Sequence, residues 1–234
     1  MTFKNLQITI LVLLLCIISC NRTGEGFTAE ELALINGADS IMRVLTIDIP
    51  ADEAVLREKS RNLSAEALLS NEYERLSELM IATVTHPSQD GVGIAGPQVG
   101  LSRRVVAVQR FDKAPVAWAG RVDHPFEVYP NVRIVWASDS LSAGPEGCLS
   151  VPDRRGEVLR SQEIVIEYVD MEVLRSRQST QRNACQGCRR KRADGEDWTV
   201  LPTTRDTVRG FTAVIFQHEI DHLNGVLYID RLPK

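Results

Sequence analysis

The feature that most restricts how this chain folds is a histidine segment near its C-terminal end, QHEIDH at residues 217–222. An α-helix advances about 3.6 residues per turn, so side chains four positions apart lie one above the other on the same face. Apolar residues at a roughly helical spacing surround the segment, and Asn224-Gly225 follows it as a stop signal, which together predict a helix. His218 and His222 therefore share a face on which they can bind one metal ion.

The glutamate between these histidines indicates hydrolytic chemistry. In an H-E-x-x-H pattern the carboxylate, here Glu219, serves as general base for a water whose pKa the metal lowers towards about 7. A catalytic zinc or iron site takes three protein ligands, and residues 223–234 hold no further histidine or glutamate. Asp230, beside the C-terminus, is a poor candidate, and His86 and His124 each precede a proline and are expected in solvated loops. We therefore expect the third ligand to come from upstream.

Two upstream segments supply candidate site residues. EGCLSVP, residues 146–152, contains Cys148, whose thiolate suits zinc or iron(II), although a packed core thiol is the alternative. GVGIAGPQ, residues 91–98, places small residues before Gln98, whose amide can donate a hydrogen bond to a developing oxyanion or simply cap a turn. The second segment lacks the Lys-Ser/Thr pair of a phosphate-binding loop, so nucleotide binding is not expected.

In this order, GVGIAGPQ, EGCLSVP and QHEIDH resemble the three motifs of the peptide deformylase family, and the resemblance runs from about Met42 to the C-terminus. It implies that one divalent metal ion, iron(II) or zinc, is bound by Cys148, His218 and His222. The other implied site residues are Glu219 as the acid/base, Gln98 and the Leu149 backbone N–H as oxyanion donors, and Gly93 and Ile94 at the substrate cleft.

The resemblance also implies a reaction, the removal of the formyl group from formyl-methionyl peptides. Glu219 would take a proton from water, the hydroxide would attack the formyl carbon, and Glu219 would then protonate the leaving amine as formate is released. The methionine side chain is expected in a pocket made by Ile94, Val151 and the apolar side of the histidine helix. The sequence departs from the family at Gly96, where alanine is common, and we expect this to change only the stiffness of the loop.

The order of the expected elements predicts an α+β fold of the peptide deformylase type, with antiparallel or mixed sheets around the metal-binding HExxH helix. A capping box at Thr28 opens a first helix, and a second helix is expected from Asn71, with Glu74 at the capping-box position. Strands are expected from Val105 to Val173, and the resemblance adds an opening strand at residues 42–46.

Residues 28–234 are expected to form a single catalytic domain with an insertion at about residues 175–206. The 234-residue chain is 44% hydrophobic and 25% charged, as is ordinary for a globular domain, and its net charge of -4 argues against general nucleic-acid binding. The insertion contains Cys185 and Cys188, for which a disulfide is favoured, with free thiols or half of a zinc clip as alternatives. We expect the insertion to cover or extend the substrate cleft.

The N-terminal residues indicate export. Residues 1–19 combine one early positive charge with a short apolar run that ends in small residues before Cys20, as in a bacterial lipoprotein signal peptide. Cleavage there would leave a lipidated Cys20 and a polar tether over residues 20–27, and the alternative is an uncleaved anchor helix. The sequence therefore predicts a membrane-anchored lipoprotein on the periplasmic or extracellular side.

The sequence is also compatible with two other classes of function. A zinc endopeptidase would share the QHEIDH helix, but it would need a different third ligand and would leave EGCLSVP unexplained. A non-catalytic lipoprotein that uses the same fold to bind peptides is the second alternative, because export separates the chain from ribosomes.

Overall fold

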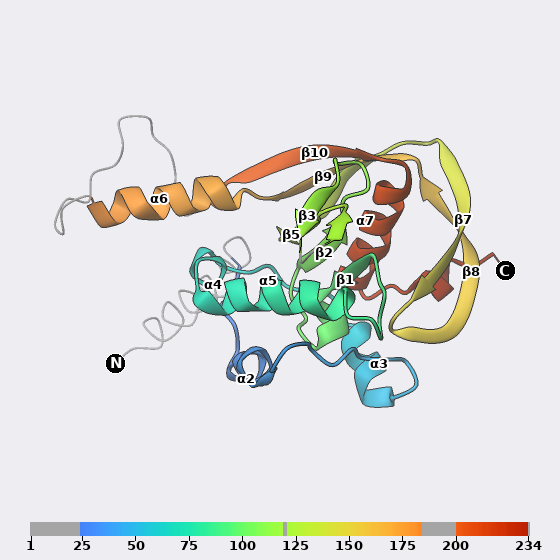
Figure 1. Cartoon of the computed structure of the whole chain (residues 1–234), viewed down its shortest axis with the longest axis horizontal. Coiled ribbons are helices and arrows are strands. Elements are labelled where there is room, and N and C mark those ends of the chain that lie inside the picture. Colours follow the sequence, from blue (N-terminus) through green and yellow to red (C-terminus); the bar gives the residue numbers. More distant parts are fainter. Residues whose placement is uncertain (1–23, 119–120, 184–199, 234) are drawn as a thin grey trace, which may run out of the picture.

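The computed structural model describes residues 24–118, 121–183 and 200–233 of the chain. Two long helices, α5 and α7, lie close to the central strands (Figure 1). The α-helices are α2 (Ala29–Gly37), α3 (Pro50–Leu56), α4 (Ala65–Leu68), α5 (Asn71–Val84), α6 (Met171–Asn183) and α7 (Gly210–Leu223), and the two 3₁₀ turns are η2 (Gly96–Val99) and η3 (Tyr228–Arg231).

The strands form small antiparallel sheets. One three-stranded sheet has the order β1-β2-β5, a second has the order β10-β9-β6, and β3-β4 and β7-β8 are two-stranded. Every pairing between these strands is antiparallel, so the expected α+β class with antiparallel sheets is confirmed. The strands are β1 (Gly93–Ala95), β2 (Val105–Gln109), β3 (Val116–Trp118), β4 (Arg121–Asp123), β5 (Phe126–Pro130), β6 (Arg133–Ala137), β7 (Leu141–Cys148), β8 (Val151–Ser161), β9 (Glu163–Val169) and β10 (Thr203–Arg209).

Helix α5 covers one side of β1 and β2 and forms the larger hydrophobic core with them. Leu76 and Met80 are fully buried on its inner face, as the helical spacing of the apolar residues requires. The N-cap is Ser70 rather than Asn71, because the Ser70 hydroxyl accepts a hydrogen bond from the Tyr73 backbone N–H at 3.2 Å. The predicted helix is therefore correct and its predicted cap is one residue late.

The first helix, α2, begins with the predicted capping box. The Thr28 hydroxyl accepts from the Glu31 N–H, and the Glu31 carboxylate accepts from the Thr28 N–H. Glu31 also binds the fully buried Arg103, with Nε 2.7 Å from Oε1. This ion pair links α2 to the loop between η2 and β2. Separating the two elements would leave an uncompensated buried charge, so the contact holds them together.

Two segments predicted to be strands have other structures. Residues 42–46 lack strand pairing, because the Leu45 N–H donates to the carbonyl of Gln98 at 2.8 Å, in a 3₁₀ turn. The strand run expected to reach Val173 ends earlier, at the end of β9. Asp170 ends it because its carboxylate accepts from the Val173 N–H at 2.9 Å and starts α6.

Gly96 has a larger role than the loop stiffness that we predicted for it. A Cβ atom at this position would lie 2.6 Å from the carbonyl oxygen of Arg103 and 2.9 Å from that of Leu101. Both neighbours are backbone atoms, so an alanine side chain fits only if the chain after η2 moves away. Glycine at position 96, where alanine is common in the family, therefore allows the backbone of η2 to lie close to the backbone of Leu101 and Arg103.

Helix α6 lies at the opposite side of the molecule from the β7-β8 hairpin (Figure 1). Residues 1–23, with the expected signal peptide and Cys20, and residues 184–199, with Cys185 and Cys188, lie outside the described part of the chain. Every helix in the described part of the chain is too short or too polar to span a lipid bilayer.

Candidate active site

Helix α7 positions both motif histidines and the glutamate between them, as the sequence predicted. Ala213 and Phe216 are buried on one side of the helix, in the core that it shares with β2. His218 and Glu219 lie on the side that lines a cleft, and His222 follows one turn after His218 and is 1% exposed. The helical period thus separates the packing face from the face that carries polar chemistry.

Cys148 ends β7 and lies next to these histidines. Its Sγ is 3.2 Å from Nε2 of His222, and the ligand atoms of Cys148, His218 and His222 all lie within 4.8 Å of one another. A thiolate and two imidazoles are the donor set that suits zinc or iron(II). The three predicted ligands therefore meet in one place, and their chemistry fits one divalent ion.

The orientation of His218 is set by a carboxylate. Nδ1 of His218 lies 2.8 Å from Oε2 of Glu146, which leaves Nε2 as the free donor of this ring. Burial raises the pKa of Glu146, but hydrogen bonds from Arg160 and His218 outweigh it and lower this pKa to about 2. Glu146 is therefore a permanent anion that holds the ring.

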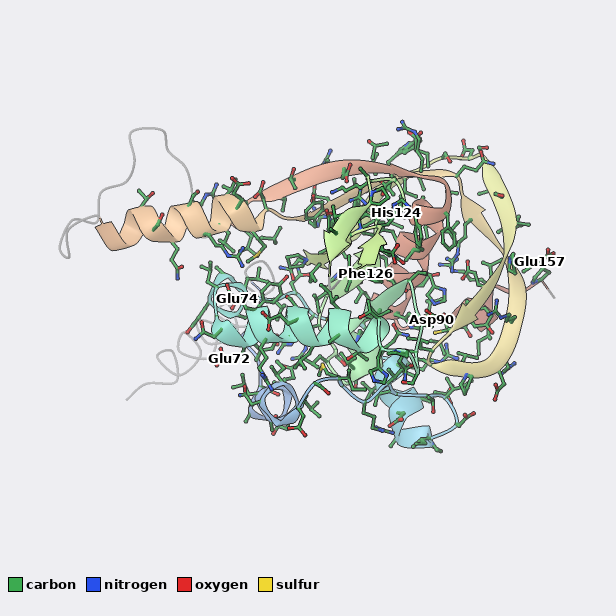
Figure 2. The ribbon with its side chains drawn as sticks, in the orientation of Figure 1. Glu72, Glu74, Asp90, His124, Phe126 and Glu157 are labelled. Atoms are coloured by element: carbon green, nitrogen blue, oxygen red, sulfur yellow. The ribbon has the colours of Figure 1, made fainter. Side chains whose placement is uncertain are left out.

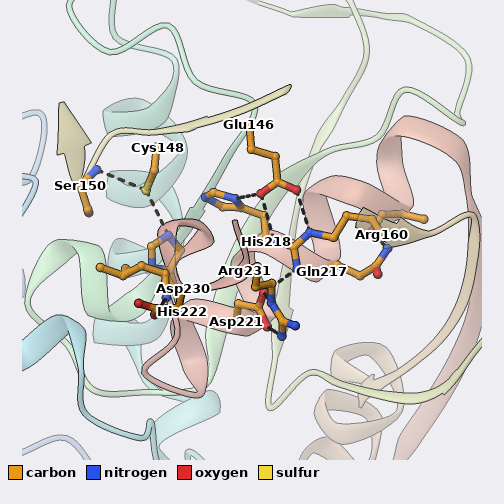
Figure 3. A network of polar contacts seen from close by, with 12 residues as sticks. Glu146, Cys148, Ser150, Arg160, Gln217, His218, Asp221, His222, Asp230 and Arg231 are labelled. Carbon is orange, nitrogen blue, oxygen red and sulfur yellow. Dashed lines mark hydrogen bonds and ion pairs between the residues drawn. The ribbon is translucent and has the colours of Figure 1, made fainter. Parts of the chain in front are cut away.

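The same carboxylate belongs to a buried network that includes a second carboxylate of α7, that of Asp221 (Figure 3). Arg160 on β8 contacts Glu146 through Nε at 2.7 Å and Nη2 at 2.9 Å, and its Nη1 contacts Asp221 at 2.5 Å. Arg231 also binds the Asp221 carboxylate. The two carboxylates and Arg160 are each less than 9% exposed, so the β7-β8 hairpin is joined to α7 by charge-assisted bonds with little competition from water.

These network residues were not among the predicted site residues. Glu146 was part of the quoted EGCLSVP segment, and metal-binding histidines commonly donate their second ring N–H to a carboxylate. This common pairing of a metal-binding histidine with a carboxylate could have identified Glu146 from the sequence. Arg160, Asp221 and Arg231 carried no comparable signal, because their contacts depend on the register of β8 and the position of η3.

Glu219 lies in a dry position against β1. Its side chain is buried, and its Oε2 has no hydrogen-bond partner among the described residues. Burial raises the pKa of Glu219 to about 7, although the positive charge of His218 opposes this shift. A carboxyl group with such a pKa can accept and return a proton near neutral pH.

The two ends of the Gln98 amide group make different contacts. Its Oε1 accepts a hydrogen bond from the Ala95 N–H at 2.8 Å and so caps η2. Its Nε2 points to the other side, 3.2 Å from the Ser150 hydroxyl and 3.6 Å from the Cys148 sulfur. The amide oxygen is therefore engaged, and the amide N–H₂ faces the Cys148 side.

The cleft has a volume of about 830 Å³ and lies between α7, the loop before β1 and the β7-β8 hairpin. Gly93, Leu149 and Val151 line it, as expected for residues near a substrate. Ile94 does not line the cleft, because successive strand residues point to opposite faces and its side chain is fully buried in the core beneath α5. The prediction that the Ile94 side chain contacts substrate is therefore wrong.

The expected insertion does not cover the cleft in the described part of the chain. None of the described residues of α6 or β10 lines the cleft. His86 and His124 are also remote from the metal donors: His86 Nδ1 contacts Ser88, and His124 Nδ1 contacts the carbonyl of Lys113. Both are exposed or partly exposed loop residues, in agreement with the sequence.

The model of the polypeptide deformylase family matches residues 43–183 and 199–234. The chain belongs to this family. The unmatched residues 184–198 fall inside the segment expected to be an insertion. Among curated relatives, the peptide deformylase of Leptospira biflexa is 28% identical over 195 residues, covering 83% of this chain and 89% of the relative. The peptide deformylase of Desulforudis audaxviator is 31% identical over 179 residues, covering 76% of this chain and 88% of the relative.

Solved deformylase structures share the fold. A class I type b peptide deformylase from Acinetobacter baumannii, bound to Met-Ala-Ser, is 29% identical, with a TM-score of 0.59 over 82% of this chain and 98% of the other. Peptide deformylase from Thermotoga maritima is 26% identical, with a TM-score of 0.59 over 84% of this chain and 100% of the other. As a member of this family, the chain is a hydrolase that uses one divalent metal ion, iron(II) or zinc, to remove N-formyl groups.

Proposed function

We propose that Cys148, His218 and His222 hold the metal ion and that Glu219 is the acid/base of the deformylation reaction. The observation that carries this assignment is the convergence of the three donors within 4.8 Å, with the buried Glu219 carboxylate, whose Oε2 has no partner among the described residues, lining the same cleft as His218. A divalent ion bound there would supply Lewis acidity, polarising the substrate carbonyl and lowering the pKa of a water to about 7.

Glu219 moves the protons in this proposal. Its carboxylate takes a proton from the attacking water, and the resulting hydroxide bonds to the formyl carbon. The C–N bond then breaks, and Glu219 returns the proton to the amine nitrogen, giving formate and a free N-terminus. The pKa of Glu219, raised to about 7, suits both transfers because the group is then neither a very weak base nor a very weak acid.

Gln98 and the Leu149 backbone N–H are the proposed donors to the oxyanion. The Gln98 amide N–H₂ faces Cys148, and its oxygen is held by the Ala95 N–H, so the donor end is oriented before substrate binds. Donors that are fixed in advance need no reorganisation during the reaction, and each is commonly worth about 10²–10³ in rate.

The proposed substrates are peptides that begin with formyl-methionine. The Acinetobacter deformylase was solved with Met-Ala-Ser bound, and deformylation of formyl-Met-Ala-Ser releases this tripeptide. In this chain, Val151 together with Val214 and Ile215 of α7 offers apolar surface at the cleft for a methionine side chain. The endopeptidase and non-catalytic alternatives are not favoured, because Cys148 completes a deformylase ligand set and Glu219 is present.

We further propose that the enzyme is an exported lipoprotein anchored through Cys20. The support is the sequence of residues 1–20, which combines a short apolar run with small residues before the cysteine. Cys20→Ser would leave the precursor uncut and abolish labelling by a fatty-acid probe. Unchanged labelling of this variant would exclude lipidation at Cys20, whatever the enzyme's activity.

The function is tested by incubating the metal-loaded enzyme with formyl-Met-Ala-Ser and measuring formate. We expect formate release by the wild type and its loss in Glu219→Gln. A folded protein substrate without a formyl group serves as the control for internal cleavage. Proteolysis of that substrate without formate release from the peptide would contradict the proposal.

A further inference from the structure

The tip of the β7-β8 hairpin carries an unusual backbone feature at the mouth of the cleft. Cys148 pairs with Val151, and the preceding residue, Gly147, pairs with Arg155, so residues 152–154 form an extended bulge without partners on β7. Asp153 lies inside this bulge with a left-handed φ of 56°. Such a conformation is costly for a residue other than glycine, and bulges near active sites commonly redirect side chains.

The bulge brings two consecutive arginines to the cleft. In a regular strand, adjacent side chains point to opposite faces, yet Arg154 and Arg155 both line the cleft here. The stem of Arg155 lies beside Gly147 on β7, since a Cβ on Gly147 would be in van der Waals contact with the Arg155 Cγ at 3.6 Å. The two guanidinium groups are thus carried on one strand at the rim of the site.

Both arginines are exposed, and neither makes an ion pair with any described residue. Other arginines at this end of the molecule, such as Arg160 and Arg231, are bound to carboxylates. The acidic residues that also line the cleft mouth are Asp90, on the loop between α5 and β1, and Asp153 itself, whereas Glu157 lies further along β8 (Figure 2). The arginine pair therefore has unused capacity to bind an anion.

The arginine pair lies at the same cleft as the proposed metal site. Cys148, His218 and Glu219 line this cleft together with Arg154 and Arg155. An anion bound by the arginines would therefore lie in the cleft that holds the reacting end of the peptide.

We propose that Arg154 and Arg155 form a carboxylate-binding subsite that selects short, released formyl peptides by their C-terminal carboxylate. This inference rests on the proposed deformylase function of the same cleft. A released peptide ends in a carboxylate, whereas a chain still being synthesised is esterified at that end and offers no charge. Guanidinium groups bind carboxylates in a forked geometry, so two unpaired arginines suit this ligand.

The length of such a peptide follows from backbone dimensions. An extended chain advances about 3.3–3.6 Å per residue, so the carboxylate of a tripeptide lies about 10 Å from the formyl end. In di-, tri- and tetrapeptides, the C-terminal carboxylate therefore lies at successively greater distances along the cleft towards its mouth. Longer chains would carry the carboxylate beyond the rim and lose the contact.

The experiment compares formyl-Met-Ala-Ser with its C-terminal amide, and repeats the comparison with the matching di- and tetrapeptides. We expect kcat/KM to be about five- to tenfold higher for the acid at one or more of these lengths, mainly through KM, because an anion held by exposed arginines strengthens binding without acting on the reacting atoms. The preference is expected to fall at high salt. In Arg154→Gln/Arg155→Gln, the acid-to-amide ratio is expected to approach 1.

Three controls distinguish the outcomes. Lys59→Gln removes an exposed charge away from the cleft and is expected to keep the ratio. Formyl-Met-Ala-Glu amide tests an acidic side chain as the source of the carboxylate, and turnover equal to that of the acids would overturn selection by the C-terminus. Equal kcat/KM for every acid and amide, or a preference that persists in the double variant, would also overturn it. Absence of formate from all peptides would instead reject the proposed deformylase function.

A binding measurement gives a second readout that does not depend on turnover. The product Met-Ala-Ser and its amide are titrated into the metal-loaded wild type and the double variant. We expect the acid to bind several-fold more tightly than the amide to the wild type only. Equal affinities for the wild type would contradict the subsite.

Discussion

Gly93 on β1 and Glu219 on α7 are in direct contact: a Cβ atom at Gly93 would lie 2.5 Å from Oε1 of Glu219. The same atom would lie 2.8 Å from Cγ2 of Ile215, one helical turn earlier. Only glycine therefore allows the Glu219 carboxylate to lie against the strand. We expect Gly93→Ala to displace the carboxylate and lower kcat/KM by about 10², because misplacing a catalytic group by about 1 Å commonly has this effect.

The measurement for Gly93→Ala is steady-state deformylation together with metal content. Gly37→Ala is the matched control, since a Cβ there meets nothing within 4 Å. Metal content should stay at the wild-type level in both variants. Full activity in Gly93→Ala would show that the Glu219 position is not constrained by this contact.

The proposed metal ligands and the proposed acid/base are expected to differ when each is replaced. Cys148→Ala, His218→Ala and His222→Ala should lose metal and activity together, because each removes one of three converging donors. Glu219→Gln should keep the metal and lose activity, because its carboxylate is not among those donors. Elemental analysis of the purified variants checks this, and a Cys148→Ala enzyme with full metal occupancy would disprove the ligand set.

Glu146 is expected to act on metal affinity through His218. Glu146→Gln removes the anion that holds Nδ1 of His218, and losses of this kind commonly reduce metal affinity by about 10- to 100-fold. Competition with a chelator measures the dissociation constant. Glu157→Gln is the control on the neighbouring strand, because Glu157 is exposed. Equal affinities for both variants would mean that Glu146 only supports the fold.

Stability is expected to depend on pH through the buried Arg110. Its Nη2 binds Asp112 at 2.7 Å, and this hydrogen bond lowers the pKa of Asp112. A carboxyl group with a lowered folded-state pKa stabilises the protein above its unfolded pKa of about 4, and the contribution is lost as the pH falls through the folded-state pKa. Asp112→Asn should therefore lower the melting temperature at pH 7, by the equivalent of about 1 kcal/mol or less, and should have a smaller effect near pH 3.

Thermal melting at several pH values measures this difference. Asp139→Asn, at an exposed position, is the control and should leave the melting temperature unchanged. A pH-independent difference between Asp112→Asn and wild type would show that the carboxylate charge is not what stabilises the contact.

The sequence predicted the site better than the surrounding chain for physical reasons. The spacing of His218 and His222 follows from the geometry of one helix, so it can be read locally. The resemblance placed Cys148 beside them, and the structure brings the three donors together. Ile94 was misplaced because the strand alternation that buries it depends on which face α5 covers, and this is a tertiary property.

The same distinction explains the misassigned strands. Residues 42–46 were expected to form a strand, but a strand needs a partner, and the N–H groups of Met42 and Leu45 bind a side chain and a 3₁₀ turn instead. Glu146 could be seen in the sequence, whereas its bonds to Arg160 depend on a hairpin register that includes the bulge at residues 152–154. The features that could not be predicted from the sequence are therefore contacts between segments that are far apart along the chain.

The hydrogen bond from the Ala95 N–H to Gln98 has a consequence for the end of the reaction. Because it holds the amide oxygen towards Ala95, the N–H₂ end of Gln98 faces the Cys148 side of the site, and this end can donate but cannot accept. A formyl oxygen is an acceptor and matches this donor. The new N-terminus of the product is an ammonium group, which only donates and finds no partner in Gln98. We therefore expect Gln98 to contribute to binding of the formyl peptide but not to binding of the deformylated peptide. Breaking the C–N bond thus favours release of the peptide product.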